Sequence, residues 1–138
     1  MLAPKKVKHR KWQRGDQIKG KATRNTNLVF GEYGLKCLSA GWVSARQIEA
    51  ARRAIVGYIQ RGGDVFIRIF PDKPITFKGN EMPMGKGKGA VDHYVAEVKP
   101  GTIMFEMRGV SRESAKRAME LARHKLSVKS KFVSKELR

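Results

Sequence analysis

Cysteine is almost absent from the chain, since Cys37 is the only one among 138 residues. A single cysteine excludes an intramolecular disulfide and the usual cysteine-based zinc sites, and it fits a reducing compartment best. Cys37 falls in a strand pattern, where a thiol behaves as a small apolar core residue. We therefore interpret it as part of the core and not as a nucleophile.

Long apolar runs are also missing, and no stretch approaches the roughly 20 residues that cross a bilayer. Residues 1–24 are basic and contain no apolar run of signal-peptide length. A basic protein that binds a membrane surface adds a bulky amphipathic helix or a lipidation signal, and neither stands out. We expect a protein that stays where it is made, in the cytoplasm or in an organelle, with no membrane partner.

Acidic residues are scarce, with 12 Asp and Glu against 30 Lys and Arg, so the formal net charge is +18. Such an imbalance needs a polyanion as counter-charge, which points to nucleic acid. Apolar residues make up 41% of the chain, enough for a folded core. The length predicts one domain, which we divide into a basic arm (1–25), a core (26–127) and a basic tail (128–138).

The arm is the first candidate RNA contact. Its basic residues are Lys5, Lys6, Lys8, Arg10, Lys11, Arg14, Lys19, Lys21 and Arg24. Trp12 lies among them and is a candidate for stacking on an RNA base.

Two amphipathic helices are expected in the core. Ser44 and Gln47 form a capping-box pattern and Gly62 supplies a stop signal, so the first helix runs from about Ala45 to Arg61. The second begins after an N-cap at Ser111 and runs to about Leu126. The residues expected on their buried faces are Ile48, Ala51, Ile55 and Ile59 in the first helix, and Ala115, Ala118, Met119, Ala122 and Leu126 in the second.

Basic side chains crowd the outer faces of both helices. They are Arg46, Arg53, Lys116, Arg117 and Arg123, with candidate ion pairs Glu49–Arg53, Glu113–Arg117 and Lys116–Glu120. Each could be a solvated charge, but together with the termini they surround the domain. Charge on several sides favours burial within folded RNA over a single DNA-reading element.

The strands are predicted from alternation at Leu28–Leu38 and Val65–Phe70. Tyr94–Val98 and Ile103–Met107 read as an antiparallel hairpin across the Pro100–Gly101 turn. A turn at Ala40 and Gly41 leads into the first helix. The fold class is therefore α+β, a two-layer sandwich of two helices on one face of a mostly antiparallel sheet. The sheet aromatics Phe66, Phe70, Tyr94 and Phe105 are interpreted as mostly core residues.

Between the strands lies a glycine- and lysine-rich loop whose candidate contacts are Lys78, Met82, Pro83, Met84, Gly85, Lys86, Gly87, Lys88 and Gly89. If residues 85–89 are extended, the glycines share one side and the two lysines the other, so bare backbone can approach a phosphate chain. A nucleotide-binding P-loop is not supported, because Gly87 stands where Ser or Thr is required and a strand follows.

Catalysis finds little support in the sequence. His9, His93 and His124 show no metal-ligand spacing. A nuclease or RNA-modifying enzyme would need clustered carboxylates, and the nearest set around the loop is Asp64, Asp72, Glu81 and Asp92. These read as turn residues, so we expect no catalytic residue, no metal and no cofactor.

Five segments in order resemble one family, the bacterial-type large-subunit ribosomal proteins of the L-sixteen family. They are Gly20–Arg24, Phe30–Leu35, Gly41–Trp42 with Ala45–Arg52, Ile67–Pro74 and Met84–Gly89, and the resemblance covers essentially the full length. It implies an α+β sandwich that binds 23S-type rRNA beside neighbouring ribosomal proteins. It also implies that the Gly/Lys loop reaches toward A-site tRNA and the peptidyl-transferase region, with P-site tRNA left open.

This sequence departs from the family pattern near the loop. Pro83 stands where many bacterial members have an arginine that is hydroxylated in some species, so that modification cannot occur here. Phe66 replaces a common Trp, and His93–Tyr94 replaces a usual Tyr–Trp pair. The resemblance implies the same fold, with altered contacts around the loop.

Overall fold

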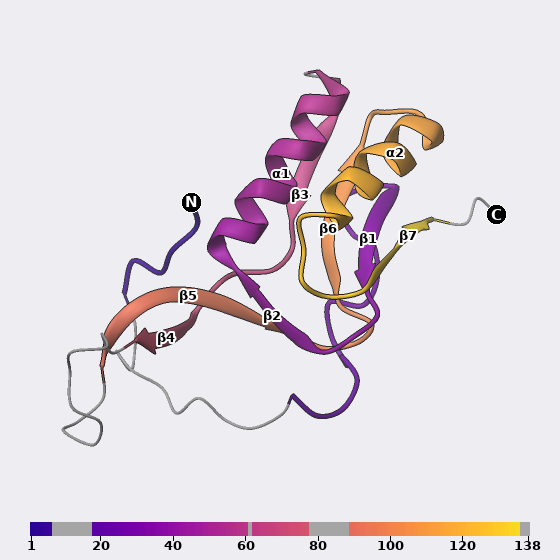
Figure 1. Cartoon of the computed structure of the whole chain (residues 1–138). Helices are drawn as coiled ribbons and strands as arrows, with labels where there is room; N and C mark the ends of the chain where they lie inside the picture. The colour runs from indigo at the N-terminus through magenta and orange to yellow at the C-terminus, as the bar shows by residue number, and fades with distance from the viewer. Residues whose placement is uncertain (7–17, 61, 78–88, 136–138) are drawn as a thin grey trace.

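The computed structural model describes residues 1–6, 18–60, 62–77 and 89–135. The chain order in Figure 1 is β1 (Tyr33–Cys37), β2 (Gly41–Ser44), α1 (Ala45–Ile59), β3 (Asp64–Ile67), β4 (Lys73–Phe77), β5 (Ala90–Val98), β6 (Ile103–Arg108), α2 (Arg112–Arg123) and β7 (Ser130–Ser134). The expected α+β architecture is confirmed. No helix among the described residues is long and apolar enough to cross a membrane.

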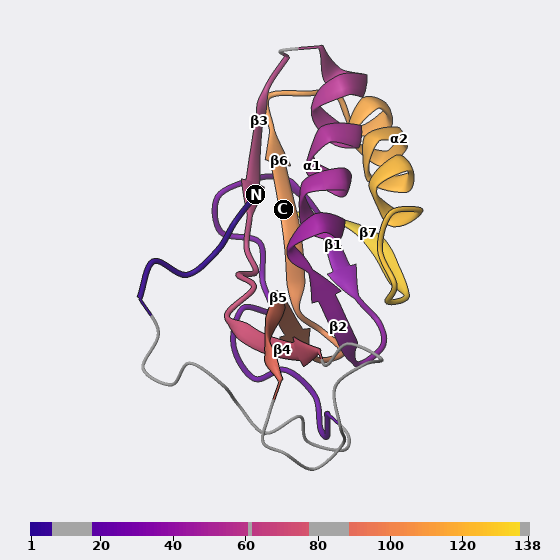
Figure 2. The same cartoon turned by 60° about the vertical axis from the view of Figure 1, so that its left-hand side comes forward.

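The strands form two antiparallel sheets instead of one. The four-stranded sheet has the order β3-β6-β1-β7, and the three-stranded sheet has the order β2-β5-β4. The two helices pack against each other and lie side by side over one face of the four-stranded sheet (Figures 1 and 2). β2 and β4 were not predicted, and residues 130–134 of the expected basic tail form β7, which pairs with β1.

The predicted hairpin of β5 with β6 is wrong. The turn itself is present, with the Thr102 N–H 3.1 Å from the Lys99 carbonyl oxygen and Gly101 at φ +101°. However, β5 pairs with β2 and β4, whereas β6 pairs with β1 and β3, so neither strand has a free edge for the other. The turn instead carries the chain from one sheet to the other, and the Gly101 N–H donates to the Cys37 carbonyl oxygen at 2.8 Å.

Helix α1 begins as predicted. The Ser44 side chain accepts from the Gln47 N–H at 3.2 Å, and the Gln47 side chain accepts from the Ser44 N–H at 3.0 Å. Ile48, Ala51 and Ile55 are buried. The helix ends at Ile59, two residues early, because Gln60 adopts the left-handed conformation at φ 48° and its N–H closes the last turn.

Helix α2 is capped by Ser111, whose hydroxyl accepts from the Ser114 N–H at 3.2 Å. The predicted alanine and methionine positions are buried, namely Ala115, Ala118, Met119 and Ala122. The helix ends at Arg123, so Leu126 lies beyond it, partly buried against the core. Alanines on the inner face let α2 approach α1 closely, which seals the core between the helices and the sheet.

The first predicted strand starts five residues late, at Tyr33, because the preceding backbone has another partner. The N–H groups of Val29, Phe30 and Gly31 donate to Oε1 of Glu106 at 2.8, 3.0 and 3.0 Å. Glu106 is fully buried in the middle of β6. Its second oxygen forms an ion pair with Arg68. The segment before β1 therefore folds around a buried carboxylate instead of extending the sheet.

The surroundings of Glu106 lower the pKa of its carboxyl group. Burial is the largest influence and raises this pKa, but the Arg68 hydrogen bond and the Gly31 and Val29 N–H groups together outweigh it. The carboxylate is thus held ionised inside the protein.

Replacing Glu106 with Gln is expected to lower the free energy of unfolding by roughly 2–4 kcal/mol, because Arg68 loses its charged partner and the three amides are left with a neutral, weaker acceptor. Urea denaturation of both proteins measures the difference. Glu32→Gln, an exposed glutamate just before β1, is the control and should change stability by less than about 0.5 kcal/mol. A loss no larger than that of the control would contradict the structural role of Glu106.

The same carboxyl group predicts a pH dependence. Its pKa is lower in the folded protein than in the unfolded chain, so its stabilisation is present above the unfolded value of about 4.3 and is lost as pH falls through the folded value. The stability difference between the wild type and Glu106→Gln should therefore shrink in acid. Urea denaturation between about pH 6 and pH 3 tests this, and a difference that stays constant would refute it.

Candidate nucleic-acid interface

The predicted contact residues fall into several separate groups in the structure. Lys8, Arg10, Lys11, Trp12, Arg14 and residues 78–88 of the loop lie outside the described residues. Among those described, Lys116 and Arg123 come together on one side of α2, whereas Arg46 and Arg53 lie on α1. The structure therefore does not gather the predicted residues into a single site.

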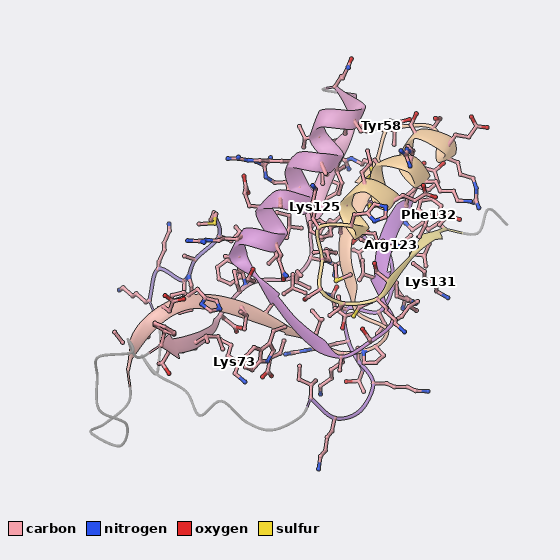
Figure 3. All side chains as sticks on the ribbon, viewed as in Figure 1. Tyr58, Lys73, Arg123, Lys125, Lys131 and Phe132 are labelled. Atoms are coloured by element: carbon pink, nitrogen blue, oxygen red, sulfur yellow. The ribbon has the colours of Figure 1, made fainter. Side chains whose placement is uncertain are left out.

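Several basic residues line a groove between α2 and β7, here called the α2–β7 groove, with a volume of about 310 Å³. Its lining residues are Leu35, Arg112, Lys116, Met119, Glu120, Arg123, Lys131 and Phe132. Figure 3 shows Lys131 and Phe132 on β7 next to Arg123 of α2. Four cations from two elements thus line the same groove as Phe132.

Helix periodicity explains half of this arrangement. Arg112, Lys116 and Arg123 are spaced by four and seven residues, which places them on one side of an α-helix. Arg112 and Lys131 were not predicted as contacts. Arg112 could have been found from its helical spacing to Lys116. Lys131 could not, because its place in the groove depends on β7 joining the sheet beside α2.

Stacked aromatic rings and one hydrogen bond hold the groove together. The Phe132 ring stacks on Tyr33, with centroids 5.8 Å apart and planes 20° apart. The Arg112 guanidinium lies 5.6 Å from the Phe132 ring centroid, and its Nη1 donates to the Ser134 hydroxyl at 2.9 Å. Arg112 is therefore held in place by an aromatic ring and a hydroxyl, neither of which neutralises its charge.

The single acid of the groove lining, Glu120, is already neutralised. Arg117 lies 3.2 Å from the Glu120 carboxylate. Glu120 therefore pairs with Arg117 and not with Lys116, the partner that the sequence predicted. Within the described part of the chain, no ion pair involves Lys116, Arg123 or Lys131. Their charges are available to an anion.

The charges on α1 are arranged differently. Glu49 is contacted by both Arg52 and Arg53, and these hydrogen bonds, Arg52 first, lower its pKa to about 2. The predicted Glu49–Arg53 pair is thus confirmed at 3.1 Å, and Arg52 joins it. Arg53 has a local counter-charge, so it is a weaker anion site than the groove.

Arg46 lies in a separate cavity of about 720 Å³, lined also by residues 1–3 and 92–94. There His93 and Asp92 form a pair with Nδ1 and Oδ2 2.7 Å apart. Figure 1 places this end of the molecule, with the N-terminal segment and β5, away from α2 and β7. The basic surface therefore has at least two separate parts.

The described end of the basic arm is attached to the core. The Ala22 N–H donates to the Pro100 carbonyl oxygen at 3.0 Å, and the Ile103 N–H donates to the Asn25 carbonyl oxygen at 2.9 Å. The flanking Lys21 and Arg24 are exposed. These two cations are consequently presented beside the turn that joins the sheets.

The residues considered for catalysis are dispersed. Asp64 pairs with Arg108 at 2.9 Å, and Asp92 pairs with His93. Cys37 is buried as expected, and burial raises the pKa of its thiol despite a hydrogen bond to Ser39. In the described ranges no group of three or more His, Cys, Asp or Glu side chains is placed to hold a metal ion.

Known proteins resemble this chain over nearly its whole length. The family model for ribosomal protein L16p/L10e matches residues 4–133. The large ribosomal subunit protein uL16 of Heliobacterium modesticaldum is 57% identical over 136 residues, which cover 99% of this chain and 94% of that protein. The chain therefore belongs to the ribosomal protein L16p/L10e family and is a component of the large subunit of the cytoplasmic ribosome.

Proposed function

We propose that the protein binds large-subunit rRNA without catalysis, by neutralising phosphates at several separate basic surfaces. The observation that carries this proposal is the α2–β7 groove, where Lys116, Arg123 and Lys131 lie together with no ion pair among the described residues. Lys and Arg side chains that contact phosphates release condensed counterions, which supplies affinity without base recognition.

The separation of the basic surfaces supports a structural role. The α2–β7 groove, the Arg46 cavity and the exposed Lys21 and Arg24 belong to different parts of the molecule. A protein that contacts phosphates on several sides holds distant RNA segments together. We include Lys5, Lys6, Lys19 and the undescribed basic residues of the arm among the proposed contacts.

We further propose that the Gly/Lys loop is directed toward tRNA in the A site. The loop connects β4 to β5, and its two ends are adjacent because Phe77 pairs with Ala90. Residues 78–88 lie outside the described residues, so this part of the proposal rests on the sequence and on family membership. Neighbouring ribosomal proteins are the other proposed partners.

The groove makes a prediction about salt dependence. Arg123→Gln should weaken binding to large-subunit rRNA and reduce the slope of log affinity against log salt by about 0.7–0.9, as expected for one lost phosphate contact. Filter binding at several salt concentrations gives both quantities.

Arg52→Gln is the matched control, because it removes the same charge from a helix residue that Glu49 already engages. It should change the salt slope by less than half as much as Arg123→Gln. Equal slopes for the two variants would show that the groove makes no special contribution.

The loop makes a second prediction. Replacing Lys86 and Lys88 with Ala should slow tRNA accommodation on reconstituted ribosomes more than it weakens rRNA binding, because the other basic residues supply most of the affinity. Rapid kinetics of tRNA binding and filter binding to rRNA measure the two effects. If both fall by the same factor, the proposed division of labour is incorrect.

A further inference from the structure

The face of the four-stranded sheet opposite the helices carries an aromatic residue that the sequence assigned to the core. Val65 and Ile67 of β3 pack against the core, so Phe66 points to the other face. Arg68 lies on the same face, because its side chain forms an ion pair with Glu106, the residue that Phe66 pairs with across the sheet. Phe66 is therefore only partly buried, on the side that α1 and α2 do not cover.

Phe30 lies on this face, next to Phe66 and Arg68. Its ring stacks with Phe66 at a centroid distance of 5.4 Å and an interplanar angle of 28°, and the Arg68 guanidinium lies 5.0 Å from its centroid. Phe66 and Arg68 are alternate residues of one extended segment and lie only about 7 Å apart, so both can contact Phe30 from the side of the sheet. The Phe30 side of the stack remains in solvent, with 52% of the residue exposed.

The backbone that carries this exposed ring is anchored to the core. The Phe30 N–H and both adjacent N–H groups donate to the buried Glu106 carboxylate. Gly31 lies so close to the Met107 carbonyl group that a Cβ atom would overlap it. A ring on an anchored backbone needs no ordering of the main chain when a ligand stacks on it, which favours binding.

Cations flank the two rings. The Arg108 guanidinium lies 5.2 Å from the Phe66 centroid, and its Nε donates to Asp64 at 2.9 Å. Its side chain is 56% exposed, so the remaining guanidinium N–H groups can reach a phosphate. An aromatic surface beside such donors matches the flat base and the phosphate of one unpaired nucleotide.

We propose that Phe30 is a stacking platform for an unpaired base of the large-subunit rRNA, with Arg108 contacting an adjacent phosphate. The proposal rests on the rRNA binding proposed above and adds a contact on a different face from the α2–β7 groove. It identifies Phe30 and Phe66, rather than Phe70, as the functional aromatics of the sheet region.

The test compares Phe30→Leu, Phe30→Trp and Phe70→Leu in filter binding to deproteinised large-subunit rRNA at several salt concentrations. Phe70 is the matched control, because it is 47% exposed and lies outside the stack. Phe30→Leu should weaken binding about 5- to 150-fold with an unchanged salt slope, since stacking is lost and phosphate contacts are kept. Phe30→Trp should retain the affinity, and Phe70→Leu should change it less than twofold.

Thermal melting of each variant separates binding from folding. Unchanged affinity of a folded Phe30→Leu variant would overturn the platform, as would equal losses in both Phe30 variants. If Phe30→Leu binds rRNA normally but enters large subunits poorly, the patch contacts a protein and the proposal is also wrong. Weak, salt-independent binding of the wild-type protein to rRNA would instead contradict the proposed rRNA-binding function itself.

Discussion

One buried carboxylate connects the main parts of this structure. Glu106 lies in the middle of β6, and it joins the segment before β1 to the end of β3 by accepting three backbone N–H groups and pairing with Arg68. A buried charge is tolerated only when such partners replace its hydration. The carboxylate therefore determines where β1 begins and holds Phe30 over the outer face of the sheet.

The two faces of the four-stranded sheet have different roles. Helices α1 and α2 cover one face and form the core, where Ile48, Ile55 and Met119 are buried. The other face carries the Phe30–Phe66 stack with its two arginines. A two-layer fold leaves one sheet face without a helix, and within the described residues that face carries the exposed Phe30 ring.

Electrostatics divides the basic residues into paired and available ones. The acids of the described chain largely have local partners, such as Glu49 with Arg52 and Glu120 with Arg117. Lys116, Arg123 and Lys131 have no such partner among the described residues and meet in the α2–β7 groove. Net charge indicates a polyanion, and the distribution of counter-charges identifies the cations that have no acidic partner among the described residues.

The sequence by itself determined the two helices, their N-caps and most of their buried faces, the α+β class and the family. Capping boxes and helical periodicity are local signals, and they hold wherever the helix packs. Only the tertiary structure decided the split into two sheets, the position of β7 and the partners of Glu106. Strand pairing joins residues far apart in the chain, as when Cys37 of β1 pairs with Ser130 of β7, and the Glu106 carboxylate likewise binds the distant amides of Val29 and Gly31, so no local pattern in the sequence reveals these contacts.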